Sequence, residues 1–192
     1  MEEGKYVRGQ RFVRAAKRFT SPGGKILDYG CGPGRISVLL ARSGFRVQGI
    51  DPAPGMLKEA AAQDLTGLAV EFALVPREGP SLRVADFDSV VCSSVIEYVP
   101  SAADLLAAFR RALRPHGVLI ISYANRLSLW RKYAKWRSPQ SPHLTLQSYV
   151  WNFNQIRGEL SRAGLGAGKS PRTHCAYFGS LVNCQPSAFS TS

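Results

Sequence analysis

Three closely spaced glycines mark the stretch of this sequence best suited to chemistry. Gly30, Gly32 and Gly34 follow a short apolar run that ends at Asp28, and apolar residues recur at helical spacing over positions 36–40. This pattern predicts a buried strand that turns sharply into a helix. Because glycine has no Cβ, the backbone of such a turn can lie against a ligand, and the start of the helix offers unpaired N–H groups to it.

A second acidic residue stands where it could join the same site. Asp51 ends the segment 45–51 and follows Gly30 by about 20 residues, the spacing at which a carboxylate at a strand end meets a ribose. Its two oxygens could accept hydrogen bonds from both ribose hydroxyls. The alternative is a turn residue, because Asp-Pro at positions 51–52 often opens a turn. The glycines at matching distance favour the ribose role.

The glycine spacing differs from the dinucleotide-binding fingerprint, whose third glycine would stand at position 35. Arg35 is found there, and the sequence reads Asp-x-Gly-x-Gly-x-Gly from Asp28 to Gly34. This motif resembles motif I of the class I S-adenosylmethionine-dependent methyltransferases. The resemblance implies S-adenosyl-L-methionine as cofactor, with Asp28 beneath its methionyl group. The cofactor-binding residues that it implies lie in the turn and at two further strand ends: Asp28, Gly30, Cys31, Gly32, Gly34, Asp51, Pro52, Met56, Ser93 and Ser94.

The segment 87–100 carries a second resemblance to this family. It is similar to the fourth strand and following turn of the small-molecule methyltransferases, with Tyr98 in place of a histidine. In that family the strand end borders the sulfonium and the acceptor cavity. Methyltransferases of nucleic-acid amines carry two consecutive prolines here, and the stretch 93–96 has none. The resemblance therefore favours a small-molecule acceptor.

Methyl transfer to a hydroxyl or an amine needs a group that removes a proton. The candidates, in falling order of expected access to the cavity, are Tyr98, His143 and Glu97. A loop histidine without a role is the alternative for His143, and a structural or cofactor-edge carboxylate is the alternative for Glu97. His116 is expected on the surface, at the end of the sheet opposite the cofactor.

These residues need a sheet that brings the strand ends together. A chain of 192 residues with 45% hydrophobic residues is enough for one α/β domain. We expect a single methyltransferase-like domain over residues 1–192, with an N-terminal amphipathic helix (1–22), a core (23–165) and a short C-terminal strand region with a tail (166–192). The fold class is α/β, a doubly wound, Rossmann-like and mostly parallel sheet flanked by helices. Whether the sheet is complete at its C-terminal edge stays open.

Apolar periodicity and turn residues predict the remaining elements. Strands are expected at 45–51, 70–75, from 87 onward and at 118–123, with 113–117 as a turn. Helices are expected at 56–61, at 104–113 and from 153, the last with Asn154 as N-cap and Gly164 as its end. A final strand, antiparallel in the related family, is expected at 177–182. No acidic residue follows the third strand where family members often bind adenine, so we assign no adenine contact.

The charge of the chain bears on its partners. Twenty-five basic against thirteen acidic residues give a net charge of +12, which attracts anionic molecules. The helix at 1–22 and the aromatic and basic segment 124–152 could contact an anionic, partly apolar acceptor. The alternatives are a solvated helix face and a packed surface helix, and peripheral membrane contact also stays open.

The sequence contains no apolar run of about 18 residues and no signal-peptide core, so we expect no transmembrane segment and a cytoplasmic location. The four cysteines show neither metal-ligand nor disulfide spacing, and no metal is expected. The favoured function is methyl transfer to a small-molecule, lipid-linked or glycan acceptor. The alternatives are an RNA or protein methyltransferase, suggested by the positive charge, and a non-catalytic cofactor-binding member of the fold. A nicotinamide oxidoreductase is a distant further option, which the glycine spacing disfavours.

Overall fold

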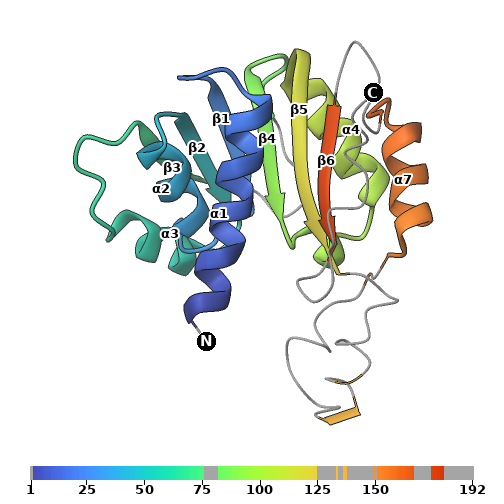
Figure 1. Cartoon of the computed structure of the whole chain (residues 1–192), viewed down its shortest axis with the longest axis horizontal. Coiled ribbons are helices and arrows are strands. Elements are labelled where there is room, and N and C mark those ends of the chain that lie inside the picture. The colour runs from blue at the N-terminus through green and yellow to red at the C-terminus, as the bar shows by residue number, and fades with distance from the viewer. Residues whose placement is uncertain are drawn as a thin grey trace.

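The computed structural model describes residues 2–75, 82–124, 133, 136–137, 149, 151–166 and 174–179, with the backbone alone for residues 2–7 and 174–179. Its centre is a six-stranded sheet in the order β3-β2-β1-β4-β5-β6 (Figure 1). The strands are β1 (Lys25–Tyr29), β2 (Arg46–Asp51), β3 (Val70–Leu74), β4 (Phe87–Ser93), β5 (Leu113–Tyr123) and β6 (His174–Gly179). All five neighbouring pairs are parallel. The predicted fold class, a Rossmann-like α/β sheet, is confirmed.

The parallel arrangement places the ends of all these strands at one edge, which we call the carboxyl edge, and their beginnings at the opposite, amino edge. The chain order along the sheet reverses between β1 and β4, because β2 and β3 lie to one side of β1 while β4 to β6 lie to the other. In open parallel sheets, ligands bind outside the carboxyl edge at such a reversal point. The glycine turn after β1 lies at that point.

Helices cover both faces of the sheet (Figure 1). They are α1 (Glu2–Phe19), α2 (Arg35–Arg42), α3 (Pro54–Ala61), α4 (Ala102–Ala112) and α7 (Phe153–Arg162), with a 3-10 turn η1 (Ile96–Tyr98) after β4. Helices α1 and α2 contribute to one apolar core, and α4 and α7 to the other. None of the helices in the described part of the chain combines the length and the apolar character that crossing a membrane requires.

The central strands are apolar on both sides because helices bury both faces of the sheet. Along β5, Leu119 and Ile121 point into the core under α4 and α7, whereas Val118 and Ile120 point into the core under α1 and α2. This alternation is the two-residue period of a strand. It explains why the segment reads as one continuous apolar run.

The structure differs from the sequence prediction at the turn expected over residues 113–117. These residues lie within β5, whose register shifts: Leu113 pairs with Phe87, but Val118 pairs with Ser89. The extra residues on β5 therefore bulge out of the ladder, and His116 takes a left-handed φ of 65° there. His116 is exposed at the amino edge, as predicted.

Two predictions near the C-terminus were also wrong in detail. The N-cap of α7 is Asn152 and not Asn154, because Asn152 and Gln155 form a reciprocal capping box. The final strand is β6 at His174–Gly179, it pairs parallel to β5, and residues 180–182 of the predicted strand lie outside the described residues. Gly164 ends α7 with a φ of 72°, as expected.

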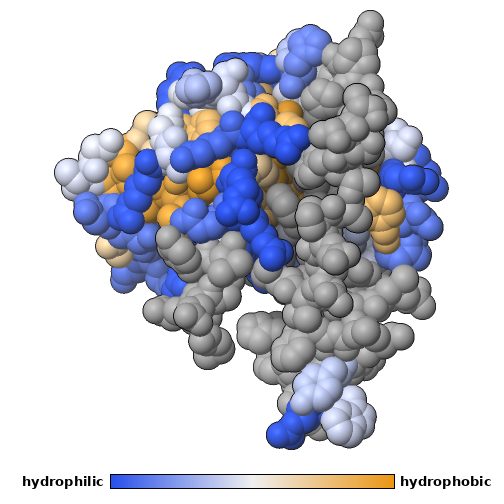
Figure 2. Space-filling model, in the orientation of Figure 1, coloured by the Kyte–Doolittle hydropathy of each residue, from blue (hydrophilic) through white to orange (hydrophobic). Residues whose placement is uncertain are grey.

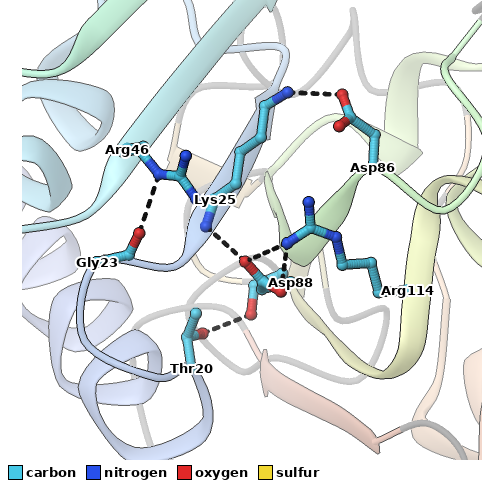
Figure 3. A network of polar contacts seen from close by, with 8 residues as sticks. Thr20, Gly23, Lys25, Arg46, Asp86, Asp88 and Arg114 are labelled. Atoms are coloured by element: carbon cyan, nitrogen blue, oxygen red, sulfur yellow. Dashed lines mark hydrogen bonds and ion pairs between the residues drawn. The ribbon is translucent and has the colours of Figure 1, made fainter.

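Ion pairs join the amino ends of β1, β4 and β5 (Figure 3). Lys25 Nζ lies 2.6 Å from Asp86 Oδ2, and Arg114 Nη1 lies 2.8 Å from Asp88 Oδ1. Asp88 Oδ2 also accepts the backbone N–H of Lys25 at 2.7 Å. Burial raises the pKa of Asp88, but these hydrogen bonds and positive charges outweigh it and leave the pKa below its usual value. The cations Lys25 and Arg114 are thus matched by carboxylates at this edge.

Candidate functional site

The glycine turn is tied to the neighbouring strand at the carboxyl edge. The backbone N–H groups of Gly30 and Cys31 both donate to the carbonyl of Ile50, at 2.8 and 3.0 Å. The turn closes with Gly34, which precedes α2, and all three glycines have left-handed φ values between 54° and 75°. Residues with a Cβ adopt such angles at a cost, so the glycines are what allow this sharp connection.

The three glycines serve different purposes in this turn. A Cβ on Gly30 would lie 2.3 Å from Cγ2 of Val95, and one on Gly34 would lie 2.6 Å from the ring of Phe72. These two positions are closely packed within the protein. A Cβ on Gly32 would meet no atom within 4 Å. Gly32 therefore leaves open space above the backbone, where a ligand can approach closely.

Asp51 lies at the end of β2 and reaches across to this turn. Its Oδ2 accepts the N–H of Gly32 at 2.8 Å, and its Oδ1 accepts the N–H of Ala53 at 2.9 Å. The side chain is buried but retains 8% exposure. Each carboxylate oxygen can accept more than one hydrogen bond. The structure thus brings the glycine turn and Asp51 together, as the sequence predicts, and leaves acceptor capacity on the carboxylate.

Asp28 lies beneath the turn, shielded from solvent. Its Oδ2 accepts the hydroxyl of Ser37 at 2.6 Å, whereas its buried Oδ1 has no hydrogen-bond partner in the part of the chain that the structure describes. Burial, aided by the nearby charge of Asp51, raises the pKa of Asp28 to about 6, although the Ser37 hydroxyl opposes the change. An unmatched buried acceptor of this kind is costly and attracts a donor or a positive charge.

The turn after β4 faces the same edge. Ser93 and Ser94 are half-buried, and Ser94 has a left-handed φ of 56°. The N–H of Ser94 donates to the hydroxyl of Ser122 at 3.1 Å and to its carbonyl at 3.3 Å, so the end of β5 holds this turn in place. From α1, Nη1 of Arg8 donates to Oγ of Ser94 at 3.4 Å.

Apolar side chains lie exposed near Asp51. Leu74, which pairs with Asp51 in the β2–β3 register, is 62% exposed, and Met56 in α3 is 39% exposed. Pro52 is exposed as well. The sequence analysis named Met56 and Pro52 as cofactor-binding residues. Near Leu74 it noted only that no acidic residue follows the third strand. Such apolar surface beside the carboxylate suits a flat aromatic base.

The three candidate bases differ in their surroundings. Tyr98 is 47% exposed in η1, whereas the adjacent Glu97 is buried with 1% exposure and its carbonyl accepts the N–H of Tyr149 at 3.0 Å. His143 lies outside the described residues. Of the two candidates that the structure describes, Tyr98 is therefore the more exposed to solvent.

Two thiols near the site are buried. Cys31 lies in the glycine turn and Cys92 in β4, and burial raises the pKa of both thiols. Both side chains are buried among apolar residues of the domain. Sequence reasoning missed three polar partners in this region: Ser37, Ser122 and Arg8. A serine within each of two otherwise apolar segments was the available signal for the first two.

Comparison with known proteins identifies a matching family model, described as a methyltransferase domain, over residues 5–167. A ubiquinone biosynthesis O-methyltransferase from Xylella fastidiosa is 36% identical over 113 residues, which cover 58% of this chain and 46% of that protein. One from Xanthomonas campestris is 34% identical over 118 residues, covering 60% and 49%. The chain thus spans about half the length of the curated relatives that it matches.

Solved structures share the fold. Phosphoethanolamine N-methyltransferase 2 from Haemonchus contortus, in complex with S-adenosyl-L-methionine, superposes with a TM-score of 0.63 at 25% identity, over 80% of this chain and 36% of that one. Magnesium protoporphyrin IX methyltransferase from Synechocystis, with bound SAH, gives a TM-score of 0.70 at 22% identity, over 86% and 75%. The second likeness concerns the fold alone.

Proposed function

Since the chain belongs to the class I S-adenosylmethionine-dependent methyltransferase domain family, we propose that it transfers the methyl group of S-adenosyl-L-methionine to a small-molecule acceptor. One observation carries the proposal: Asp51 Oδ2 accepts the N–H of Gly32 at 2.8 Å, directly beside the open space above Gly32. A strand-end carboxylate and a backbone without side chains therefore meet at the reversal point of the sheet.

The residues present fit an adenosyl ligand. Asp51 has acceptor capacity for ribose hydroxyls, and the exposed apolar surface of Leu74 and Met56 suits the adenine ring. Asp28 supplies an unmatched buried acceptor beneath the turn, which favours positive charge above it. When bound, S-adenosyl-L-methionine supplies an electrophilic methyl group on a sulfonium. Orientation and exclusion of water are then the main tasks of the protein.

The acceptor would approach over the turn after β4. Ser94, held by Ser122, borders that space, and Tyr98 is the accessible candidate for receiving the acceptor proton. The O-methyltransferase relatives act, by name, in ubiquinone biosynthesis, and the H. contortus relative is named for phosphoethanolamine. Both names support a small-molecule acceptor. Which small molecule it is, including a lipid-linked or glycan intermediate, stays a prediction. The single-domain organisation over residues 1–192 and the cytoplasmic location also remain predictions from the sequence.

Calorimetric titration with S-adenosylhomocysteine tests the proposal. We expect binding by the native chain and a large loss of affinity in Asp51→Ala, with Asp64→Ala as the control because Asp64 is an exposed carboxylate hydrogen-bonded to Thr66. No measurable binding by a folded sample would contradict the proposal. Binding without turnover on a broad acceptor panel would support the non-catalytic alternative. Strongly salt-dependent retention of RNA would support the nucleic-acid alternative.

A further inference from the structure

Helix α1 reaches from the amino edge of the sheet past its carboxyl edge. Its C-terminal end is fixed at the amino edge, where the hydroxyl of Thr20 hydrogen-bonds with that of Ser89. Figure 1 shows that its N-terminal turns extend beyond the arrowheads of β4 and β5. The first part of α1 therefore lies beside the space above the strand ends, where the proposed acceptor would bind.

Arg8 is an exposed residue of α1 that continues the line of its buried face. Phe12, Ala15 and Ala16 form the buried stripe of the helix, and Arg8 precedes Phe12 by four residues, which places it on the same face one turn earlier. At this position Arg8 contacts the turn that follows the end of β4. A cation thus takes the place of the next apolar residue in the stripe, at the point where the stripe passes the carboxyl edge.

The contact that Arg8 makes there is weak. Its Nη1 donates to Oγ of Ser94 at 3.4 Å, which is long for a hydrogen bond. A guanidinium carries five N–H donors, and among the residues whose side chains the structure describes no carboxylate forms an ion pair with Arg8. Ser94, by contrast, is held firmly by Ser122. Arg8 therefore has donors to offer above a fixed polar turn.

Other cations of the region do not share this position. Lys25 and Arg114 are paired with carboxylates at the amino edge (Figure 3). Arg14 and Lys17 are exposed on the outer side of α1, where Figure 2 shows hydrophilic side chains along the helix. Within the described part of α1, Arg8 is the basic residue that contacts the turn after β4.

We propose that Arg8 is a specificity residue that binds an anionic oxygen group, a carboxylate or a phosphate, on the methyl acceptor. When the acceptor is bound, the guanidinium of Arg8 exchanges its long contact with Ser94 for paired, charge-assisted hydrogen bonds to the acceptor. Ser94 stays in place as a neighbouring hydroxyl. The proposal rests on the proposed function, since it names the class of acceptor for the same site.

The test compares three probes of similar shape: 4-hydroxybenzoate, 4-hydroxyphenyl phosphate and neutral 4-hydroxybenzyl alcohol. Their dissociation constants are measured by calorimetry or ligand-observed NMR, with and without saturating S-adenosylhomocysteine. We expect at least one anionic probe to bind about tenfold or more tightly than the alcohol, because a charge-assisted pair contributes on this order. Whichever anion binds more tightly distinguishes a carboxylate from a phosphate.

Arg8→Gln should bring the anionic probes to the affinity of the alcohol, Arg8→Lys should restore part of the difference, and Arg14→Gln should leave it unchanged. Equal thermal midpoints show that the variants are folded. A wild-type protein that binds all three probes equally, or none of them, overturns the proposal, as does an anion preference that survives Arg8→Gln. Failure to bind S-adenosylhomocysteine would instead refute the proposed function, and the measurements without it would still decide the role of Arg8.

Discussion

Replacing Asp28 by asparagine should stabilise the folded protein at pH 8 and weaken its binding of S-adenosylhomocysteine. The carboxyl is buried beneath the glycine turn, and burial raises its pKa from 3.8 to about 6. Below pH 3.8 the group is protonated in both the folded and the unfolded chain, so its ionisation has no effect on stability. As the pH rises toward 6, the unfolded chain loses this proton first, and the free energy of unfolding falls.

The size of the effect follows from the difference between the two pKa values. About two pKa units, at about 1.4 kcal/mol each, correspond to roughly 3 kcal/mol above pH 6. Asparagine is neutral throughout and lacks this penalty. The gain in free energy of unfolding on Asp28→Asn should therefore be near zero at pH 4 and grow to roughly 2 to 3 kcal/mol at pH 8. Urea denaturation at several pH values measures it.

Asp88→Asn is the matched control, because the pKa of Asp88 lies below its usual value. The stability that this carboxylate contributes is present above its unfolded pKa and disappears as the pH falls through the folded one. Asp88→Asn should thus lose stability at pH 8, opposite in sign to Asp28→Asn. A stability change on Asp28→Asn that is the same at every pH, or that turns unfavourable at pH 8, would refute the reasoning.

Measuring the affinity of the same variant for S-adenosylhomocysteine tests whether Asp28 takes part in ligand binding. The negative charge of Asp28 lies below the turn, where it favours a cationic ligand group, so affinity for S-adenosylhomocysteine at pH 8 should fall about tenfold in Asp28→Asn. Higher stability together with weaker ligand binding is the result expected when a residue serves ligand binding at a cost in stability. Unchanged affinity would confine Asp28 to a structural role.

Four further substitutions have distinct expected outcomes. Asp51→Ala should lower the affinity for S-adenosylhomocysteine roughly thirtyfold in calorimetry, because hydrogen bonds to a charged group contribute about 2 kcal/mol, while Asp64→Ala leaves it unchanged. Gly30→Ala should reduce the free energy of unfolding by about 2 to 4 kcal/mol, because the added Cβ would meet packed atoms. Gly32→Ala should reduce it by about 1 kcal/mol and should act mainly on ligand affinity. Equal effects of the two substitutions on unfolding and on ligand affinity would contradict these different roles. Ser37→Ala removes the hydroxyl that lowers the pKa of Asp28, so its loss of about 1 to 3 kcal/mol in denaturation should be greater at pH 8 than at pH 5.

Local patterns account for what the sequence predicted well. The glycines after Asp28 and the apolar spacing of the next helix depend on neighbouring residues only, and the structure has a strand, a turn and a helix there. The position of Asp51 across from Gly32 followed from chain spacing in a parallel sheet. These predictions succeeded because each required one turn or one crossover.

Where local signals competed, the prediction was less accurate. Asn152 and Asn154 are both good N-caps, and the reciprocal bond with Gln155 decides between them, a signal visible as the Asn-x-x-Gln spacing. The bulge before Val118 was not visible as part of a strand, because Pro115 cannot donate to a ladder and turn residues surround it. Such details depend on which partner strand the segment meets.

Contacts between distant residues were beyond sequence reasoning. Arg8 and Ser94 are 86 positions apart, and nothing in either segment specifies the other. The burial of Glu97 likewise depends on how η1 packs under its neighbours. The contact between the glycine turn and Asp51 was predictable, whereas the contact between α1 and the turn after β4 was not, because these segments come together only in the tertiary fold.

The placement of β1 between β2 and β4 has a consequence for biosynthesis. Ile26 pairs with Ser89, so the reversal point of the sheet has only one of its two flanking strands until that later segment has emerged from the ribosome. Pairings of such long sequence separation form slowly. A nascent chain therefore exposes an unpaired flank of its earliest strand for much of its synthesis, and a stalled product lacking β4 would carry the glycine motif without a place to hold a nucleoside.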